Sequence, residues 1–262
     1  QESVFNFCAF VCIDAKDKWI AARKQNYGNV SYLNLPASFD IETSSFYDDK
    51  KQKVAIMYVW QFGINGNIIM GRTWEQYVYL CSILTHVLDL SPKKRLLIYV
   101  HNLGYEFQFM RKWFKWKEVF APKKRRPLIA LSELGIEYRC SYFLSNYSLA
   151  NVGKLVLQKY KVEKMVGDLD YSLIRTPVSP LTKKEIIYCI NDVKVVMSYI
   201  QEKIEQEGDI TQIPLTNTGN VRRYVRSRVF GEKSEDAKKK RRQYTDLMRS
   251  LRVTSPEEYA QM

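Results

Sequence analysis

The sequence lacks the features that most readily identify a zinc-binding, redox-active or secreted protein. Its cysteines form no CxxC pair, and their number is odd: Cys8, Cys12, Cys81, Cys140 and Cys189. Cys8 and Cys12 are close enough in sequence to be considered as zinc ligands. No histidine lies near them, so they are only a weak candidate for a zinc site. No secretory signal precedes the cysteines, so we expect reduced thiols in a cytosolic compartment.

Long apolar runs are also missing. No stretch approaches the roughly 18 apolar residues that a membrane helix requires, so no membrane partner is expected. The segment 4–13 (VFNFCAFVCI) is apolar but short, and it lacks the preceding basic residues of a signal peptide. We expect it to form a buried strand, followed by a helix near residues 17–23.

Negative charge is scarce relative to positive charge. The chain has 41 Lys and Arg against 28 Asp and Glu, which gives a net charge of +13 and a pI near 9.4. This balance suits a nucleic-acid-binding protein, because each neutralised phosphate releases counterions, although a merely basic protein would share it. Twelve basic residues lie between positions 221 and 252, where either a solvated linker or a phosphate contact is expected.

The remaining pattern predicts an α/β fold. A chain of 262 residues with 46% hydrophobic content can bury one sizeable core. Periodicity and capping residues predict strands at 38–43, 54–62, 67–70 and 96–100, two further strands within 128–144, and helices at 73–88, 105–116, 149–160 and 181–207. Such an order implies helices packed on a mixed central sheet. We divide the chain into an N-terminal extension (1–35), the core domain (36–215) and a basic linker (216–262).

Two acidic motifs lie on predicted regular structure. Asp40 and Glu42 are two residues apart in a strand, so their carboxylates face the same side. Tyr188 and Asp192 are four residues apart on the long helix, so they share one helix face. Taken singly, each has an ordinary explanation: a strand end that emerges into water, and a polar stripe on an amphipathic helix.

A third acidic motif lies where a predicted strand turns into a helix. The segment 99–109 (YVHNLGYEFQF) turns through Asn102 and Gly104 and places Glu106 in the first turn of a helix. The helix dipole alone would favour a carboxylate at that position. The three motifs are more specific in combination than any one of them alone.

In this order the motifs resemble the DEDD-type 3′→5′ exonucleases of the tyrosine-containing class. The chain is most similar to the exonuclease domain of protein-primed family B DNA polymerases of phages and linear plasmids. The resemblance spans roughly residues 37–230 and rests on the segments 40–43 (DIET), 101–103 (HNL), 147–149 (YSL), 167–171 (GDLDY) and 188–192 (YCIND). It implies a ribonuclease H-like fold and two-metal hydrolysis of single-stranded DNA from its 3′ end.

The resemblance also implies roles for individual residues. Two divalent ions, Mg²⁺ or Mn²⁺, would be held by Asp40, Glu42, Glu106 and Asp192, while Tyr188 would orient the attacking water. The 3′ end of the DNA would be held by Thr43, Asn102, Tyr105, Ser148 and Leu149. The ions would also offset the repulsion between these carboxylates, because two carboxylates 4 Å apart repel by about 4 kcal/mol at an effective dielectric constant of 20.

The sequence departs from the family pattern in two places. Glu106 stands where the family usually has aspartate, and its extra methylene fits poorly with the strict octahedral geometry of Mg²⁺. The family's lysine near Gly167 is not clearly placed, with Lys164 as the nearest candidate. An alternative interpretation is therefore a weakened exonuclease-like module that binds single-stranded DNA or a terminal-protein primer; a weaker one is a related nuclease that acts on RNA.

The carboxylate motifs of a polymerising palm domain are not found in this sequence. We therefore expect a polymerase domain elsewhere, in the same protein or on a separate chain, and a terminal protein as a further partner. The expected location is the cytoplasm, that of the host cell if the protein is viral.

Overall fold

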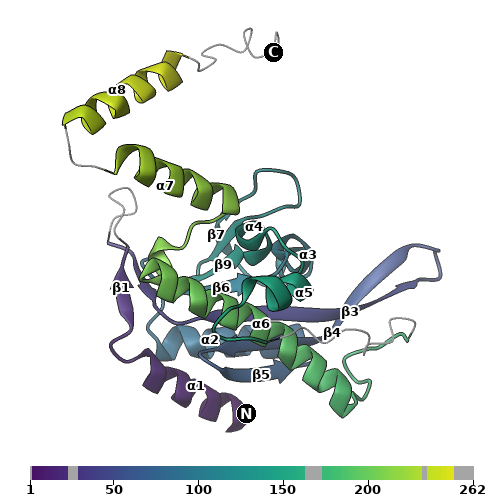
Figure 1. The fold of residues 1–262 in the computed structure, drawn as a ribbon. Coiled ribbons are helices and arrows are strands. Elements are labelled where there is room, and N and C mark those ends of the chain that lie inside the picture. The colour runs from purple at the N-terminus through teal and green to yellow at the C-terminus, as the bar shows by residue number, and fades with distance from the viewer. Residues whose placement is uncertain (1, 23–28, 163–172, 232–234, 251–262) are drawn as a thin grey trace. The chain divides into compact units, whose positions relative to one another are not determined.

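The computed structural model describes residues 2–22, 29–162, 173–231 and 235–250 (Figure 1). The chain divides into two compact units, Gln1–Leu215 and Thr216–Met262. The first unit contains the sheet with its covering helices, and the second consists of helices in the part that is described. Each unit is described by itself below.

The first unit is built on a mixed nine-stranded sheet. Seven strands lie in the order β5-β4-β3-β6-β9-β8-β7. Their bounds are β3 (Ala37–Tyr47), β4 (Lys53–Ile64), β5 (Asn67–Gly71), β6 (Lys94–Val100), β7 (Trp116–Phe120), β8 (Ile129–Ser132) and β9 (Ile136–Cys140). β3 is antiparallel to β4 and parallel to β6, and β6 is parallel to β9. The ends of β3 and β4 continue as a hairpin that extends away from the rest of the sheet (Figure 1).

Besides the N-terminal helix α1 (Glu2–Ala15), the described helices of this unit are α2 (Trp74–Val87), α3 (Leu103–Met110), α4 (Ser141–Ser145), α5 (Leu149–Asn151) with a π-helical turn at Val152–Val156, and α6 (Lys183–Glu207), followed by the 3₁₀ turn Ile210–Gln212. Thr73 and Thr182 close capping boxes at the starts of α2 and α6, which confirms the predicted helix starts. α3 ends at Met110 rather than at residue 116, because Phe114 and Trp116 turn back to pack on Tyr138 of the sheet.

The N-terminal segment differs from the sequence prediction. Residues 4–13 belong to helix α1 (Glu2–Ala15), not to a strand, and residues 19–21 form β1 (Trp19–Ala21), not a helix. The physical reason is a stripe of side chains about four residues apart, Phe7, Val11 and Ala15, that is buried in the main core. Short apolar runs do not distinguish a buried strand from a helix. A turn that the sequence predicts at Asn26, Gly28 and Asn29 lies largely outside the described residues.

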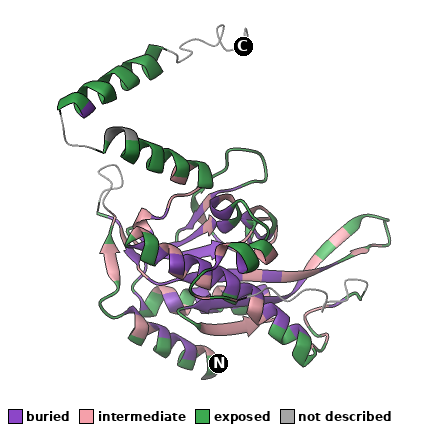
Figure 2. Cartoon of the chain, in the orientation of Figure 1, coloured by how far each residue is buried: buried purple, intermediate pink, exposed green. Residues whose placement is uncertain are grey.

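The core occupies both faces of the sheet (Figure 2). Along β6, Leu96, Ile98 and Val100 enter the cluster shared with α1 and α2. The intervening Leu97 and Tyr99 enter a second cluster with the apolar side of α6. Because successive strand side chains face opposite sides, one fully buried strand supports both layers, as the run LLIYV predicted. These features confirm the predicted α/β class.

A buried ionic network ties three strands together. Glu137 of β9 is paired with Arg95 of β6 at 2.8 Å and with Arg139 at 2.6 Å. The hydroxyl of Tyr32, on β2 (Ser31–Leu33), donates to the same carboxylate at 2.8 Å. Burial alone would raise the pKa of Glu137, but the charges of Arg139 and Arg95 and their hydrogen bonds outweigh it and lower that pKa.

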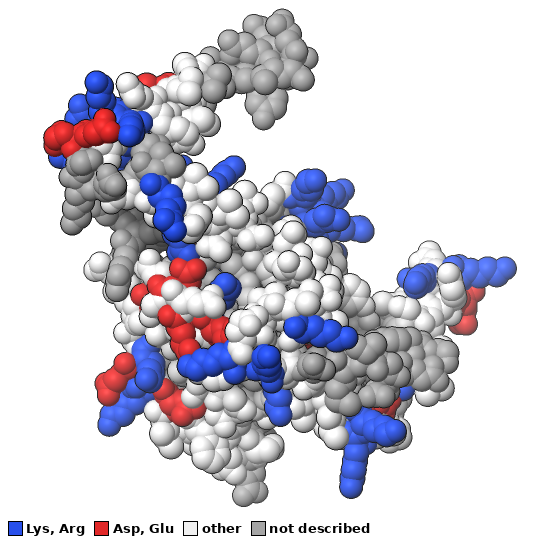
Figure 3. Space-filling view, in the orientation of Figure 1, with Lys and Arg blue, Asp and Glu red and all other residues white. Residues whose placement is uncertain are grey.

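The second unit contains α7 (Asn217–Phe230) and α8 (Glu235–Ser250), where the sequence predicted a basic linker. Almost all of their described side chains are exposed, apart from Ala237. On the visible face of the chain, lysine and arginine side chains are widely distributed, whereas acidic side chains gather in a few groups (Figure 3). Among the described helices, none is both long enough and apolar enough to cross a membrane.

Candidate metal and nucleic-acid site

The first part of the candidate site is the middle of β3. This strand lies between β4 and β6, and it carries Asp40 and Glu42 on one face, both only partly buried. The pairing of β3 with β4 shifts register between Glu42 and Thr43. Such bulges change the direction of the strand and are common beside active sites. The two carboxylates therefore lie where an otherwise buried strand becomes accessible.

The second part of the site comes from α6, which packs against β3 and β4. Tyr188 and Asp192 lie one turn apart on the buried side of this helix. The ring of Tyr188 packs against Tyr58 and Val59 of β4, and Val59 is the strand partner of Glu42. Asp192 is only 4% exposed, and carboxylates are rarely buried to this degree.

Polar contacts fix the start of α6 to the sheet. The backbone N–H of Arg175 donates to the hydroxyl of Ser44 on β3 at 2.8 Å, and the Arg175 guanidinium pairs with Glu185 in the first turn of α6. On the other side, Arg72 donates to the carbonyl oxygens of Thr176 and Ser179 at 3.1 and 2.6 Å. The segment before α6 is therefore bonded to both β3 and the end of β5, which fixes the face that α6 presents to β3.

The result is a group of three carboxylates from two distant parts of the chain. Oxygen atoms of Asp40, Glu42 and Asp192 all lie within 4.8 Å of one another. An octahedral Mg²⁺ with ligands at 2.0–2.1 Å places its ligand oxygens about 3–4 Å apart, so a small adjustment would let these three oxygens share one ion. Hard carboxylate oxygens are the ligands that Mg²⁺ and Mn²⁺ prefer. The donor set thus fits a divalent cation.

Glu106 approaches this group without joining it. It lies in the first turn of α3, is 4% exposed, and is not among the three residues whose oxygens lie within 4.8 Å. Burial, together with the charges of Asp40 and Glu42, raises the pKa of Glu106 well above its ordinary value. Its Oε2 atom has no hydrogen-bond partner among the described residues. A buried oxygen without a hydrogen-bond partner, beside an acidic group, fits a site that binds a cation.

Sequence reasoning missed Gln61. This residue is fully buried on β4, directly opposite Asp40 in the strand register. Its side-chain amide donates to Oδ2 of Asp40 at 2.7 Å, so it holds one candidate metal ligand in position. The available signal was a single amide in the apolar run VAIMYVWQF, because a buried polar side chain normally has a specific partner.

The predicted DNA-binding residues are only partly brought together. Tyr105 and Thr43 share a short hydrogen bond between their hydroxyls, and both line a hollow of about 420 Å³ with Glu42 and Ser45. Tyr105 is 43% exposed, so part of its side chain is accessible from solvent. Asn102 begins α3 in the left-handed conformation, with φ of 75°. It turns the chain from β6 into the helix that carries Glu106.

Ser148 and Leu149 lie at the start of α5. The Ser148 hydroxyl accepts a hydrogen bond from the N–H of Asn151 at 3.4 Å, and Leu149 packs partly against the second core cluster. α5 packs against α6, and the cluster that Leu149 joins includes Val195 and Tyr199 of that helix. The other predicted elements, Lys164 and the segment 167–171, lie outside the described residues.

A basic loop lies close to the start of α3, the helix that carries Glu106. A Cβ atom at Gly104 would lie 2.8 Å from the carbonyl oxygen of Arg125, so only glycine permits this contact. The loop 122–126 (PKKRR) is therefore held against the start of α3, two residues before Glu106. All four of its basic side chains are exposed.

Comparison with known proteins identifies a similar fold. No protein-family model and no curated protein matches the chain. The structure of Phi29 DNA polymerase in an orthorhombic crystal form superposes with a TM-score of 0.54 and 14% identity, over 70% of this chain and 32% of the polymerase. Phi29 DNA polymerase complexed with single-stranded DNA gives a TM-score of 0.52 at 14% identity, and its binary complex with primer-template DNA gives 0.52 at 12%, each over 67% of this chain and 32% of the polymerase.

The chain therefore spans about a third of the length of the polymerase that it resembles. The likeness confirms the predicted α/β fold, a mixed sheet with flanking helices, which the chain shares with part of Phi29 DNA polymerase. At this level of identity it is a statement about fold, and activity has to be argued from the site.

Proposed function

We propose that the chain is a 3′→5′ exonuclease that removes nucleotides from single-stranded DNA with two divalent ions, as the proofreading region of a protein-primed DNA polymerase. The observation that carries this proposal is the convergence of Asp40, Glu42 and Asp192 within 4.8 Å. The shared fold with Phi29 DNA polymerase adds support. The polymerising domain and a terminal-protein primer are proposed partners.

The chemistry follows from the residues around the group. When bound, divalent ions would lower the pKa of an attacking water and stabilise the leaving 3′-oxygen. Asp40, Glu42 and Asp192 would hold them, with Glu106 as a fourth acidic group close by. Gln61 keeps Asp40 in place through its 2.7 Å hydrogen bond. Tyr188 offers a hydroxyl that can donate or accept a hydrogen bond, as a group that orients water must.

The surroundings fit an unpaired strand. Beside Glu42, the hollow lined by Thr43 and Tyr105 is open to solvent, and an exposed aromatic ring can stack on any base. One turn along α3, the ring of Phe109 lies 5.2 Å from that of Tyr105. Phe109 lines a second hollow of about 560 Å³, together with Arg111 and Lys112. Aromatic rings next to positive charges are the usual composition of single-strand binding surfaces. That Phi29 DNA polymerase has structures with single-stranded and primer-template DNA supports DNA as the partner.

The test is digestion of a labelled oligonucleotide. With Mg²⁺ or Mn²⁺ and a 5′-labelled single strand, we expect a ladder of products that shorten from the 3′ end. The double variant Asp40→Ala/Glu42→Ala should abolish the ladder. A control with two exposed acids removed, Asp89→Ala/Glu118→Ala, should retain it. Digestion that persists in the double variant would refute the proposal, and faster cleavage of a matched RNA strand would reassign the substrate.

The position of Glu106 favours a second candidate function. Its carboxylate is buried and lies outside the group of three, as it would in a module that binds single-stranded DNA or a terminal-protein primer without efficient cleavage. Glu106→Asp distinguishes the two functions. If the wild-type chain is inactive with Mn²⁺ and Glu106→Asp restores digestion, the weakened module is correct. If the wild-type chain digests DNA, the weakened module is excluded.

A further inference from the structure

The second unit contains a groove lined by arginine. α7 and α8 enclose a hollow of about 520 Å³, and four of its seven lining residues are Arg222, Arg223, Arg226 and Arg241. The other three are Gly219, Ser227 and Gly231, so among the described residues no carboxylate lines the groove. The sequence marked this region only as a basic segment, and the proposed nuclease chemistry does not use it.

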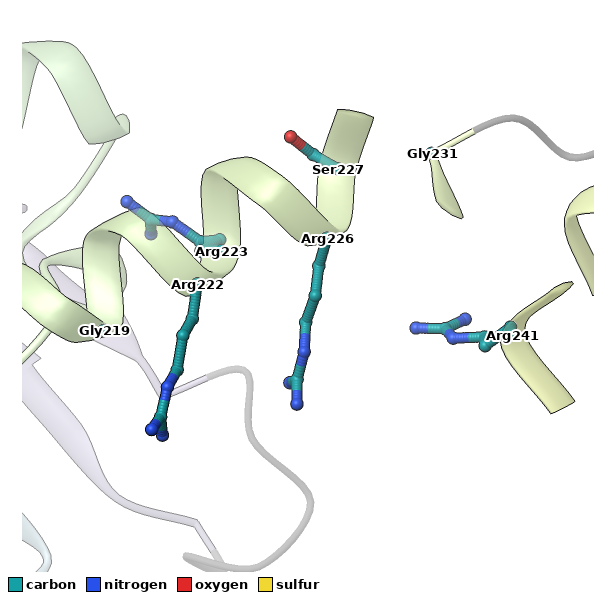
Figure 4. A pocket seen from close by; sticks show the side chains of 7 residues that line it. All are labelled: Gly219, Arg222, Arg223, Arg226, Ser227, Gly231 and Arg241. Carbon is teal, nitrogen blue, oxygen red and sulfur yellow. The ribbon is translucent and has the colours of Figure 1, made fainter. Parts of the chain in front are cut away.

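Three of the arginines converge on one space (Figure 4). Arg222 and Arg226 extend side by side from the same face of α7, and Arg241 points toward them from α8. Arg223 is turned to another side of α7, where it donates to Asn220 at 3.4 Å. Positions four apart are separated by about 6 Å along a helix axis, which is close to the spacing of successive phosphates in a nucleic-acid strand.

Within the described part of the unit, no acidic side chain is paired with Arg222, Arg226 or Arg241. In the described part of α7 there are four arginines and no acidic residue. The acids of α8 pair with lysine or arginine of their own helix: Glu235 with Lys238, Asp236 with Lys240, and Asp246 with Arg249. Across the part of the chain that the structure describes, no ion pair involves Arg222, Arg226 or Arg241. Like charges at this spacing repel one another, and an anion between them removes that repulsion.

We propose that the groove between α7 and α8 binds the phosphodiester backbone of a nucleic-acid strand, at a site separate from the carboxylates of the first unit. Guanidinium groups suit this ligand because each can bond two phosphate oxygens at once. The axial spacing of Arg222 and Arg226, close to that of successive phosphates, favours a nucleic acid over an acidic peptide. This proposal does not depend on the nuclease activity.

The experiment measures binding of the full chain to a fluorescent oligo-dT by anisotropy, in EDTA so that no divalent ion is present. The test variant is Arg222→Gln/Arg226→Gln/Arg241→Gln. The control removes three charges from the same helices outside the groove: Arg228→Gln/Lys239→Gln/Arg242→Gln. We expect the test variant to bind at least tenfold more weakly near 150 mM salt. The slope of log K against log salt should fall by about 2, because each lost phosphate contact removes about 0.7.

The control decides whether the site is specific. A loss of less than about threefold in the control supports the groove, whereas equal losses in the two variants overturn it in favour of diffuse charge. Unchanged binding in the test variant also overturns it. A second variant, Arg222→Lys/Arg226→Lys/Arg241→Lys, keeps the charges and the helices but loses the two-point contacts, so it should bind several-fold more weakly than wild type. If polyglutamate binds the wild-type groove and oligo-dT does not, the occupant is an acidic protein segment and the proposal fails.

Discussion

Glu42→Gln should stabilise the metal-free chain. In the folded state the carboxylate of Glu42 lies within 4.8 Å of those of Asp40 and Asp192. One such pair repels by about 3.5 kcal/mol at an effective dielectric constant of 20, and by about 0.9 kcal/mol in bulk water. Glu42 is only partly buried, so the lower end of this range carries more weight. Removing its charge at nearly constant shape should raise the free energy of unfolding by about 1–3 kcal/mol.

The assay is urea unfolding at pH 7, first in EDTA and then in Mn²⁺. In EDTA the midpoint of Glu42→Gln should exceed that of the wild type. Mn²⁺ should stabilise the wild type by about 2.7 kcal/mol when its concentration is 100 times the dissociation constant. The variant should gain less from the ion, because it has lost one ligand. When the metal is added, the wild type should therefore become as stable as the variant or more stable than it.

The control is Glu118→Gln, which removes one exposed acid from β7 and should leave both midpoints nearly unchanged. The interpretation would be refuted if Glu42→Gln were less stable than wild type in EDTA and still gained the full stabilisation from Mn²⁺. That result would mean that the three carboxylates neither repel one another strongly nor share an ion.

Three further predictions follow from single residues. Gln61→Leu removes the amide that holds Asp40; it should lower nuclease activity about 10- to 100-fold, as loss of an outer hydrogen bond to a metal ligand does, with normal unfolding in EDTA as the check on the fold. Glu137→Gln should cost about 3–5 kcal/mol at pH 7, because it leaves Arg139 buried without its charge partner. The pKa of Glu137 is lowered in the folded chain, so the extra stability of the wild type over the variant should be complete above about pH 5. It should decline as the pH falls below the pKa of the unfolded chain, near 4.3. Urea midpoints measured from pH 3 to 7 check this, and a difference that stays constant with pH would contradict it. Gly104→Ala would place a Cβ 2.8 Å from a backbone oxygen of the basic loop. The loop would have to move away from α3, so oligonucleotide binding measured by anisotropy should weaken. Unaltered binding would show that the position of the loop against α3 does not contribute to nucleic-acid binding.

Local geometry explains which parts of the site could be predicted from the sequence. Two carboxylates at positions i and i+2 of a strand share a face because of the pleat. A phenol and a carboxylate at i and i+4 share a helix face, and Thr182 with Glu185 marked where that helix begins. Each of these inferences needs only a few neighbouring residues. The motif order then pointed to the fold, which the comparison with Phi29 DNA polymerase bears out.

Tertiary packing decided the rest. The segment 4–13 became a helix because its stripe of Phe7, Val11 and Ala15 could be buried against the main core, and a run of ten apolar residues does not reveal that choice. Gln61 acquired its partner only through the register of β3 and β4. Whether Glu106 joins the group of three carboxylates depends on where α3 packs, and sequence spacing carries no such distance. The sequence therefore determined which side chains share a face, whereas the packing of α6 and α3 on the sheet determined which of them meet.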